Sequence, residues 1–213
     1  MANFHIYFSF CCLLLTWYCR IIVARPMRTN RARERGLCAT QFKHLSVSVS
    51  GLLKHDVLWH GIKSDRILPT TSSDTVLACA PALNKTMCHI QRLGSFNESD
   101  CLKNIVKDLY HYEAIIRSYT SLDLRHPDEE VPPLTQTLSI IPNLLQACRF
   151  TSMSKSSDKV VAHMWEDSSY SNRLKMLMMM KAFYVRTITF NRAVGYIESG
   201  EHRSLGPSSD PLQ

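Results

Sequence analysis

One stretch near the carboxyl end, residues 170–199, constrains the fold more than any other part of the chain. Its apolar residues, with one threonine among them, recur at alternating spacings of four and three: Met176, Met180, Phe183, Thr187, Phe190, Val194 and Ile197. On a helix this spacing brings the side chains onto one continuous stripe, which is typical of a face that packs against a core. The pattern therefore predicts a long helix with a buried face.

The side of this helix opposite the stripe mixes cations with apolar residues. Lys181 and Arg192 fall there, and Met178, Val185 and Ile188 lie among them. Such a mixture is typical of a partner surface, because an arginine can bury its apolar stem while its guanidinium donates hydrogen bonds. Two interpretations stay open. Either this face binds another protein, or the helix is buried on all sides and Arg192 reaches water at its end.

Residues 1–24 have the character of a secretory signal peptide. Phe8 to Val23 is apolar apart from two hydroxyl residues and Arg20, and the run ends just before Arg25. A transmembrane anchor is the alternative, although Arg20 shortens the apolar run below the usual span. We therefore expect a secreted, extracellular product with no stable membrane insertion after signal cleavage.

Cysteine usage adds a constraint on assembly. Three of the eight cysteines, Cys11, Cys12 and Cys19, would leave with the signal peptide. The other five are Cys38, Cys79, Cys88, Cys101 and Cys148. In an oxidising compartment an odd count leaves one thiol without an internal mate, which predicts either a bond to another chain or one inert buried thiol. The wide spacings disfavour a zinc site.

Helical periodicity recurs in three earlier segments. Residues 38–59 carry an apolar series at helical spacing, although residues 45–50 also alternate as a strand would. Residues 100–119, which Ser99 or Asp100 can cap, and residues 134–148 form two further amphipathic patterns, and Pro142 is expected to kink the second. The three series are Cys38, Phe42, Leu45, Val49, Leu52 and Trp59; Leu102, Ile105, Leu109, Tyr112, Ile116 and Tyr119; and Leu134, Leu138, Ile141, Leu145 and Cys148.

The remaining segments read as connections and tails. Residues 25–37 form a basic leader, which we expect to be a disordered tail, with glycan binding or proteolytic processing as alternatives. Residues 60–97 form a long loop with N-glycosylation sequons at Asn84 and Asn97. Residues 125–133 form a short turn in which prolines stop a helix, and residues 151–169 form a second long connection. Residues 200–213 are expected to be a disordered C-terminal tail.

Four helices joined by long, short and long connections predict one architecture. The short link forces the second and third helices to be antiparallel, whereas the long links permit parallel neighbours. The expected fold class is therefore all-α, a long-chain four-helix bundle of the cytokine type with up-up-down-down connectivity, over residues 38–199.

Motifs for catalysis or cofactor binding are missing from the sequence. It has no HExxH, GxSxG or phosphate-binding glycine loop. Asp108, His111 and Glu113 fit solvated helix positions better than a metal site, and the methionines of residues 176–180 fit core packing better than a copper or haem site. A net charge of +7 without aromatic residues on a basic face disfavours nucleic acid. We predict no enzyme activity, no cofactor, no metal and no nucleic-acid partner.

Five segments carry a likeness to a known family: residues 78–81 (ACAP), 84–88 (NKTMC), 108–112 (DLYHY), 144–147 (LLQA) and 181–192 (KAFYVRTITFNR). They resemble the helical alpha subunits of the interleukin-12 cytokine family. The resemblance covers most of residues 76–199 and is looser over the first helix. It implies a subunit that pairs with a receptor-like beta subunit and signals through interleukin-12 receptor chains to lymphocytes and natural killer cells.

The resemblance also implies roles for particular residues. Cys88 matches the cysteine that bonds to the beta subunit, and Cys79 and Cys101 match an internal pair. Arg192 matches an arginine that enters a pocket of the beta subunit, and Tyr170 matches an aromatic residue that touches the signalling receptor. With Arg192, the predicted beta-subunit interface comprises Lys181, Val185 and Ile188.

The sequence departs from the family at several cysteines. A family disulfide between the loop after the first helix and the last helix is missing at both ends, near Gly61 and at Leu177. Cys38 lacks its family mate, and Cys148 is not a family position, so a bond between these two is possible and would leave Cys88 as the odd thiol. The alternative function is a single-chain helical cytokine of the interleukin-6 type, which acts without a partner subunit.

Overall fold

The computed structural model describes residues 26–68, 74–80, 96–150 and 164–200, with side chains from Gly36 onward. The chain divides into two compact units, Met1–Leu37 and Cys38–Gln213. Its helices, in chain order, are α2 (Pro26–Leu53), α3 (Asp56–Trp59), α4 (Asp74–Ala78), α5 (Glu98–Thr120), α6 (Pro127–Ala147) and α7 (Ser169–Ser199). No strand occurs within the described ranges.

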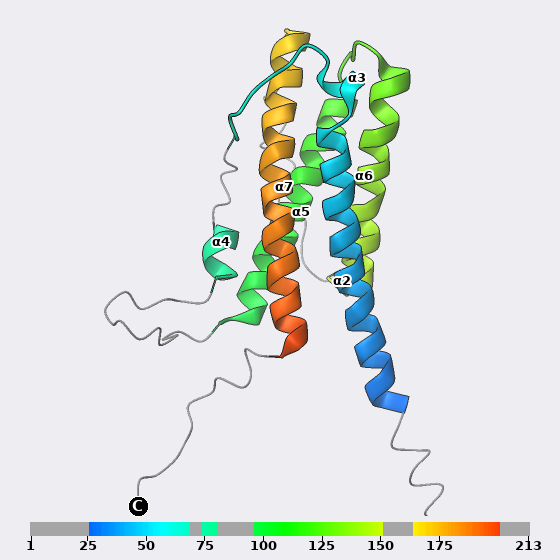
Figure 1. Cartoon of the computed structure of the whole chain (residues 1–213), viewed down its shortest axis with the longest axis vertical. Helices are drawn as coiled ribbons and strands as arrows, with labels where there is room; N and C mark the ends of the chain where they lie inside the picture. The colour runs from blue at the N-terminus through cyan, green and yellow to red at the C-terminus, as the bar shows by residue number, and fades with distance from the viewer. Residues whose placement is uncertain (1–25, 69–73, 81–95, 151–163, 201–213) are drawn as a thin grey trace, which may run out of the picture. The chain divides into compact units, whose positions relative to one another are not determined.

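Four long helices, with α2 counted from Cys38 onward, lie in the second unit and confirm the predicted bundle. In Figure 1, α2 and α5 run in one direction and α6 and α7 run in the other, which is the up-up-down-down connectivity. Side-chain hydrogen bonds join α2 to both neighbours: Ser48 meets Thr137 of α6 at 2.7 Å, and Thr187 of α7 donates to Ser46 at 3.2 Å. The first helical pattern is therefore a helix and not a strand: Leu45 and Val49 are fully buried, whereas Val47, which a strand would place on the same face as these two, is 70% exposed.

The core consists of the predicted stripes. Nearly all of their members have no more than a few per cent of their surface exposed, whereas Leu102, Ile197 and the two cysteines Cys38 and Cys148 are partly buried. Aromatic pairs join the helices: the rings of Phe42 and Phe190 meet edge to face at 6.0 Å, and those of Tyr112 and Phe183 stack at 4.1 Å. Periodicity therefore identified the contact faces of all four helices.

The ends of the last helix follow the standard capping rules. Ser168 accepts a hydrogen bond from the backbone N–H of Ser171 at the start of α7, and Gly200 ends the helix in the left-handed conformation with φ of 72°. Residues with a side chain rarely adopt that φ, so a glycine is favoured there.

The start of α5 differs from the expectation. Asn97, and not Ser99 or Asp100, is the residue whose side chain caps the helix. The helix therefore begins at Glu98, slightly earlier than predicted, because the asparagine oxygen can accept from an N–H of the first turn.

Two helices begin earlier than the local sequence predicts. The basic leader, expected to be a disordered tail, is helical from Pro26 onward, since proline suits the first position and the arginine-rich stretch has high helix propensity. Helix α6 begins at Pro127 and runs through Pro132, Pro133 and Pro142, although the first two were expected to act as stops. Burial of Leu134, three acidic residues in the first turn and tertiary packing outweigh the lost backbone donors.

The segment predicted as one helix up to residue 59 is divided: α2 ends at Leu53, and the short helix α3 follows it. A second short helix, α4, lies within the loop predicted over residues 60–97 and was not predicted. Among the residues with described placement, none of the helices has the length and apolar character that a bilayer crossing requires.

Candidate functional site

The outer face of α7 carries the predicted interface residues in a partly exposed state. Arg192 is exposed, Val185 keeps 47% of its surface, and Ile188 and Lys181 are half-buried. The opposite face, with Phe183 and Phe190, is fully buried. Of the two interpretations of this helix, burial on all sides is therefore wrong, and the mixed apolar and cationic face is open to solvent in this chain.

Lys181 has a partner inside the chain. Its ammonium donates a hydrogen bond to the backbone carbonyl of Ser64, in the connection that follows α3. The backbone N–H of Leu68 also donates to the carbonyl of Met178, at 3.4 Å. The connection over residues 64–68 is therefore held against α7 beside the face defined by Arg192, Val185 and Ile188, which we call the α7 outer face.

Arg173 extends this attachment toward the start of α7. Its side chain is 7% exposed, and its guanidinium donates to the carbonyls of Val57, Leu58 and His60 at 3.0–3.3 Å. These carbonyls belong to α3 and the turn after it, so one side chain satisfies several acceptors that the helix end leaves free. We refer to Arg173 and Lys181, with the carbonyls that they bind, as the α7 clamp.

The sequence reasoning missed Arg173. A signal was present, because the residue lies three positions before Met176 and therefore on the core stripe. A buried cation needs hydrogen-bond acceptors. The acceptors of Arg173 are more than 110 residues away in the sequence, so a local pattern could not identify them.

A buried ion pair lies between α5 and α7. The Nε atom of Arg186 lies 3.8 Å from Oδ2 of Asp108, and the two side chains are 12% and 0% exposed. Nearby, burial lowers the pKa of His111, and the charge of Asp108 opposes that shift only partly. Glu113 pairs with Arg117 at 2.7 Å. Across the described residues, no group of three or more His, Cys, Asp or Glu side chains is placed to hold a metal ion.

Two hollows lie near the start of α7, and Arg173 lines both. A cavity of about 20 Å³, enough for one water, is lined by residues that include Tyr119 and Glu130, both almost fully buried. Burial, and secondarily the charge of Glu130, raise the pKa of Tyr119 well above its usual value. A wider cleft of about 330 Å³ is lined by Asp56, Val57, His60, Arg125, His126, Glu129 and Arg173.

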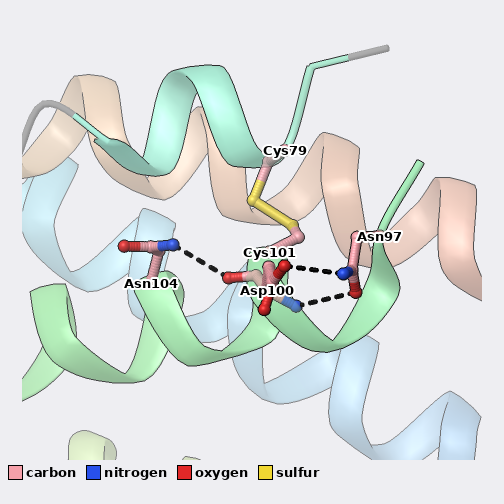
Figure 2. Close-up of a disulfide and its surroundings, with 5 residues drawn as sticks. All are labelled: Cys79, Asn97, Asp100, Cys101 and Asn104. Carbon is pink, nitrogen blue, oxygen red and sulfur yellow. Dashed lines mark hydrogen bonds between the residues drawn. A yellow bond between two sulfur atoms is a disulfide. The ribbon is translucent and has the colours of Figure 1, made fainter. Parts of the chain in front are cut away.

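Two intrachain disulfides are present. Cys79 bonds to Cys101, as the resemblance implies, and joins the end of α4 to α5; Cys38 bonds to Cys148, a pairing that the sequence left as a possibility, and joins α2 to the end of α6. Figure 2 shows the second bond beside the cap of α5. Cys88, the remaining cysteine of the predicted mature chain, lies outside the described residues, and so does Asn84.

The other predicted sites lie at helix starts. Tyr170, in the first turn of α7, is 56% exposed. Asn97 is exposed as the cap of α5. Tyr170 lies in the first turn of α7, several turns before the residues of the α7 outer face. Figure 1 shows the start of α7, in yellow, at the end of the bundle beside α3.

Comparisons with known proteins agree with this architecture. A family model described as the interleukin-12 alpha subunit matches residues 66–200. The interleukin-12 subunit alpha of Macaca mulatta is 28% identical over 99 residues, which are 46% of this chain and 44% of that protein. The protein of the same name from Canis lupus familiaris is 28% identical over 106 residues, 50% of this chain and 46% of that protein.

The protein of that name from Homo sapiens is 27% identical over 99 residues, again 46% of this chain and 44% of that protein. The chain thus spans less than half the length of these curated relatives. The family model covers more than half of this chain, and the family consists of cytokine subunits and not of enzymes. With its helical bundle and its two intrachain disulfides, the chain belongs to the interleukin-12 alpha subunit family.

Proposed function

We propose that this chain is a secreted cytokine alpha subunit that pairs covalently, through Cys88, with a receptor-like beta subunit and signals through interleukin-12-type receptor chains. Its relatives carry the name interleukin-12 subunit alpha. The observation that carries the proposal is the disulfide arrangement. The two internal bonds use four of the five cysteines of the predicted mature chain and leave Cys88 for a second chain.

The α7 outer face supports the non-covalent part of this pairing. Val185 and Ile188 offer apolar surface to a partner, and Arg192 is exposed beside them on the same helix face. An arginine surrounded by apolar contacts is a frequent source of binding energy at protein interfaces. Lys181 contributes indirectly, since its bond to Ser64 fixes the connection that borders this face.

Tyr170 supports a separate receptor contact. It keeps 56% of its surface exposed at the start of α7, and a tyrosine suits an interface because it combines a large apolar ring with a hydroxyl that can hydrogen-bond. A receptor chain could then approach the end of the bundle while the beta subunit covers the α7 outer face.

Co-expression with a candidate beta subunit tests the covalent proposal. The wild-type chain should appear on a non-reducing gel as a linked heterodimer that reduction separates. Cys88→Ser should abolish the linked band while co-precipitation still recovers the partner. The matched controls are Cys79→Ser and Cys101→Ser together, which remove an internal bond and should leave the linked band in place. A linked band from Cys88→Ser, with the sulfur of another residue in the cross-link, would contradict the proposal.

A further inference from the structure

Asn97 has two roles that involve the same atoms. It is the acceptor residue of the sequon Asn97-Glu98-Ser99, and it is the residue that caps α5. Its Oδ1 accepts the backbone N–H of Asp100 at 3.1 Å, and its Nδ2 donates to Oδ2 of Asp100 at 2.6 Å. Figure 2 shows both polar atoms of the carboxamide facing Asp100.

The two contacts define which amide hydrogen is engaged. A backbone N–H can only donate, so the atom that it meets is the oxygen of the carboxamide. Oδ1 and Nδ2 of Asn97 both face Asp100. The amide hydrogen that lies on this shared edge of the carboxamide is the one on the same side as Oδ1. The hydrogen that Asp100 accepts is therefore the one that lies beside Oδ1.

Glycosylation would replace that same hydrogen. The product is a secondary amide, which strongly prefers the trans arrangement of its carbon substituents. In the trans arrangement the first sugar carbon, C1, lies on the side of the amide oxygen. The sugar would consequently occupy the space in which Asn97 now meets the carboxylate of Asp100.

Asp100 is held in this position independently of the Asn97 side chain. Its backbone carbonyl accepts from the side chain of Asn104 at 2.9 Å, whereas its contact with Lys103, at 3.4 Å, is exposed and contributes little to that position. The next residue, Cys101, donates its N–H to the carbonyl of Asn97 at 3.0 Å and is bonded to Cys79. Once this end of α5 has formed, the carboxylate is already in place to accept from the carboxamide.

We propose that the Asn97 carboxamide serves either as the two-point cap of α5 or as a glycan acceptor, so that glycan transfer must precede folding of this helix end. The inference rests on the proposed secretion of the chain. In the transfer, Nδ2 forms a bond to C1 of an oligosaccharide, the bond from C1 to the phosphate of a lipid pyrophosphate donor breaks, and the lipid pyrophosphate leaves. The amide proton passes to a base of the transferase. Chains that close the cap first remain bare.

Glycan occupancy in secretory cells tests this competition. The full chain is expressed without a partner and with Asn84→Gln, so that a gel shift removed by endoglycosidase reports Asn97 alone. We expect partial glycosylation of Asn97 in the chain with Asp100 and a larger glycosylated fraction for Asp100→Ala. When dithiothreitol keeps Cys79 and Cys101 reduced, the glycosylated fraction should be equally large with and without the Asp100→Ala substitution. The matched control Lys103→Ala removes an exposed contact of Asp100 and should leave occupancy unchanged.

Three results would overturn the proposal. Equal glycan occupancy of the wild-type and Asp100→Ala chains under oxidising conditions would show that the cap does not compete with glycan transfer. This holds whether Asn97 is fully glycosylated or not glycosylated at all. A difference that persists under reduction would assign the effect to the sequence preference of the transferase. An effect of Lys103→Ala as large as that of Asp100→Ala would assign it to local charge.

Thermal stability gives a second, independent readout. Ser99→Ala removes the sequon and keeps Asn97, which provides a bare chain. In that chain Asp100→Ala should lower Tm by about 2 °C, because a charge-assisted hydrogen bond is lost. In the glycosylated chain the same substitution should lower Tm by less, and equal shifts would contradict mutual exclusion. Neither measurement involves a beta subunit, so failure here is distinguishable from failure of the Cys88 linkage.

Discussion

Arg186 of α7 and Asp108 of α5 form an ion pair in the interior of the bundle, with Nε and Oδ2 3.8 Å apart and the carboxylate side chain fully buried. Removing one partner leaves the other charge in a poorly solvated site. We expect Arg186→Met to lower the free energy of unfolding by about 3 kcal/mol, measured by urea denaturation. The double variant Arg186→Met with Asp108→Leu should recover a large part of this loss. Additive losses in the double-mutant cycle would mean that the two charges do not interact.

The part of the α7 clamp formed by Arg173 should affect both global stability and local opening of the chain. Arg173→Leu leaves the carbonyls of Val57, Leu58 and His60 without their donor, so we expect a loss of about 3 kcal/mol of stability. Amide exchange over residues 57–62 should accelerate more than exchange in α5. The control Lys103→Ala breaks an exposed ion pair and should cost less than about 0.5 kcal/mol. Uniform acceleration throughout the bundle would argue against a local clamp.

The pKa of His111 predicts how stability depends on pH. Burial lowers the pKa in the folded chain below 6.5, the value expected for the unfolded chain. Above pH 6.5 both states hold a neutral imidazole, and below it the unfolded chain binds a proton that the folded chain resists. Stability should therefore fall as the pH drops from 7.5 to 5.5, and it should fall less for His111→Gln in matched denaturant titrations. If stability changed with pH in the same way in the wild type and in His111→Gln, His111 would not be a cause of the pH dependence.

The two disulfides should differ in their contribution to stability. Cys38 and Cys148 are 110 residues apart in the sequence, whereas Cys79 and Cys101 are 22 apart. In the loop-entropy model the longer loop gives the larger effect, by about 1.4 kcal/mol. Paired Cys→Ser variants, compared by equilibrium unfolding, should therefore show the greater loss for Cys38 and Cys148. The reverse order would point to structure retained in the unfolded chain.

Arg192 should be the main non-covalent anchor if the α7 outer face binds a beta subunit. Arg192→Ala in a Cys88→Ser background should weaken reversible binding by about 2 kcal/mol, which is roughly 30-fold in Kd by surface binding. Lys107→Ala, at an exposed position on α5, is the matched control and should change Kd by less than about twofold. An unchanged affinity for Arg192→Ala would mean that the side chain stays solvated in the complex.

The sequence by itself determined which faces of the four long helices are buried. Apolar spacing of three and four residues leaves few alternatives to an amphipathic helix, and the connection lengths then select one bundle topology. The positions of Phe42, Tyr112, Ile141 and Phe183 in the core were predictable for this reason. The open α7 face was predictable only as one of two possibilities, because periodicity shows that a residue is off the core stripe and not what covers it.

Only the tertiary structure decided the polar pairings and some helix starts. Arg173 and Arg186 find partners on elements that lie far away in the sequence, and hydrogen bonds depend on distances that no local pattern encodes. Helix α6 continues through prolines that local rules treat as stops, because burial of its apolar face outweighs the missing backbone bonds. The residue that caps α5 is likewise Asn97 and not the predicted Ser99 or Asp100, because the geometry of the first turn, and not residue type alone, selects the acceptor.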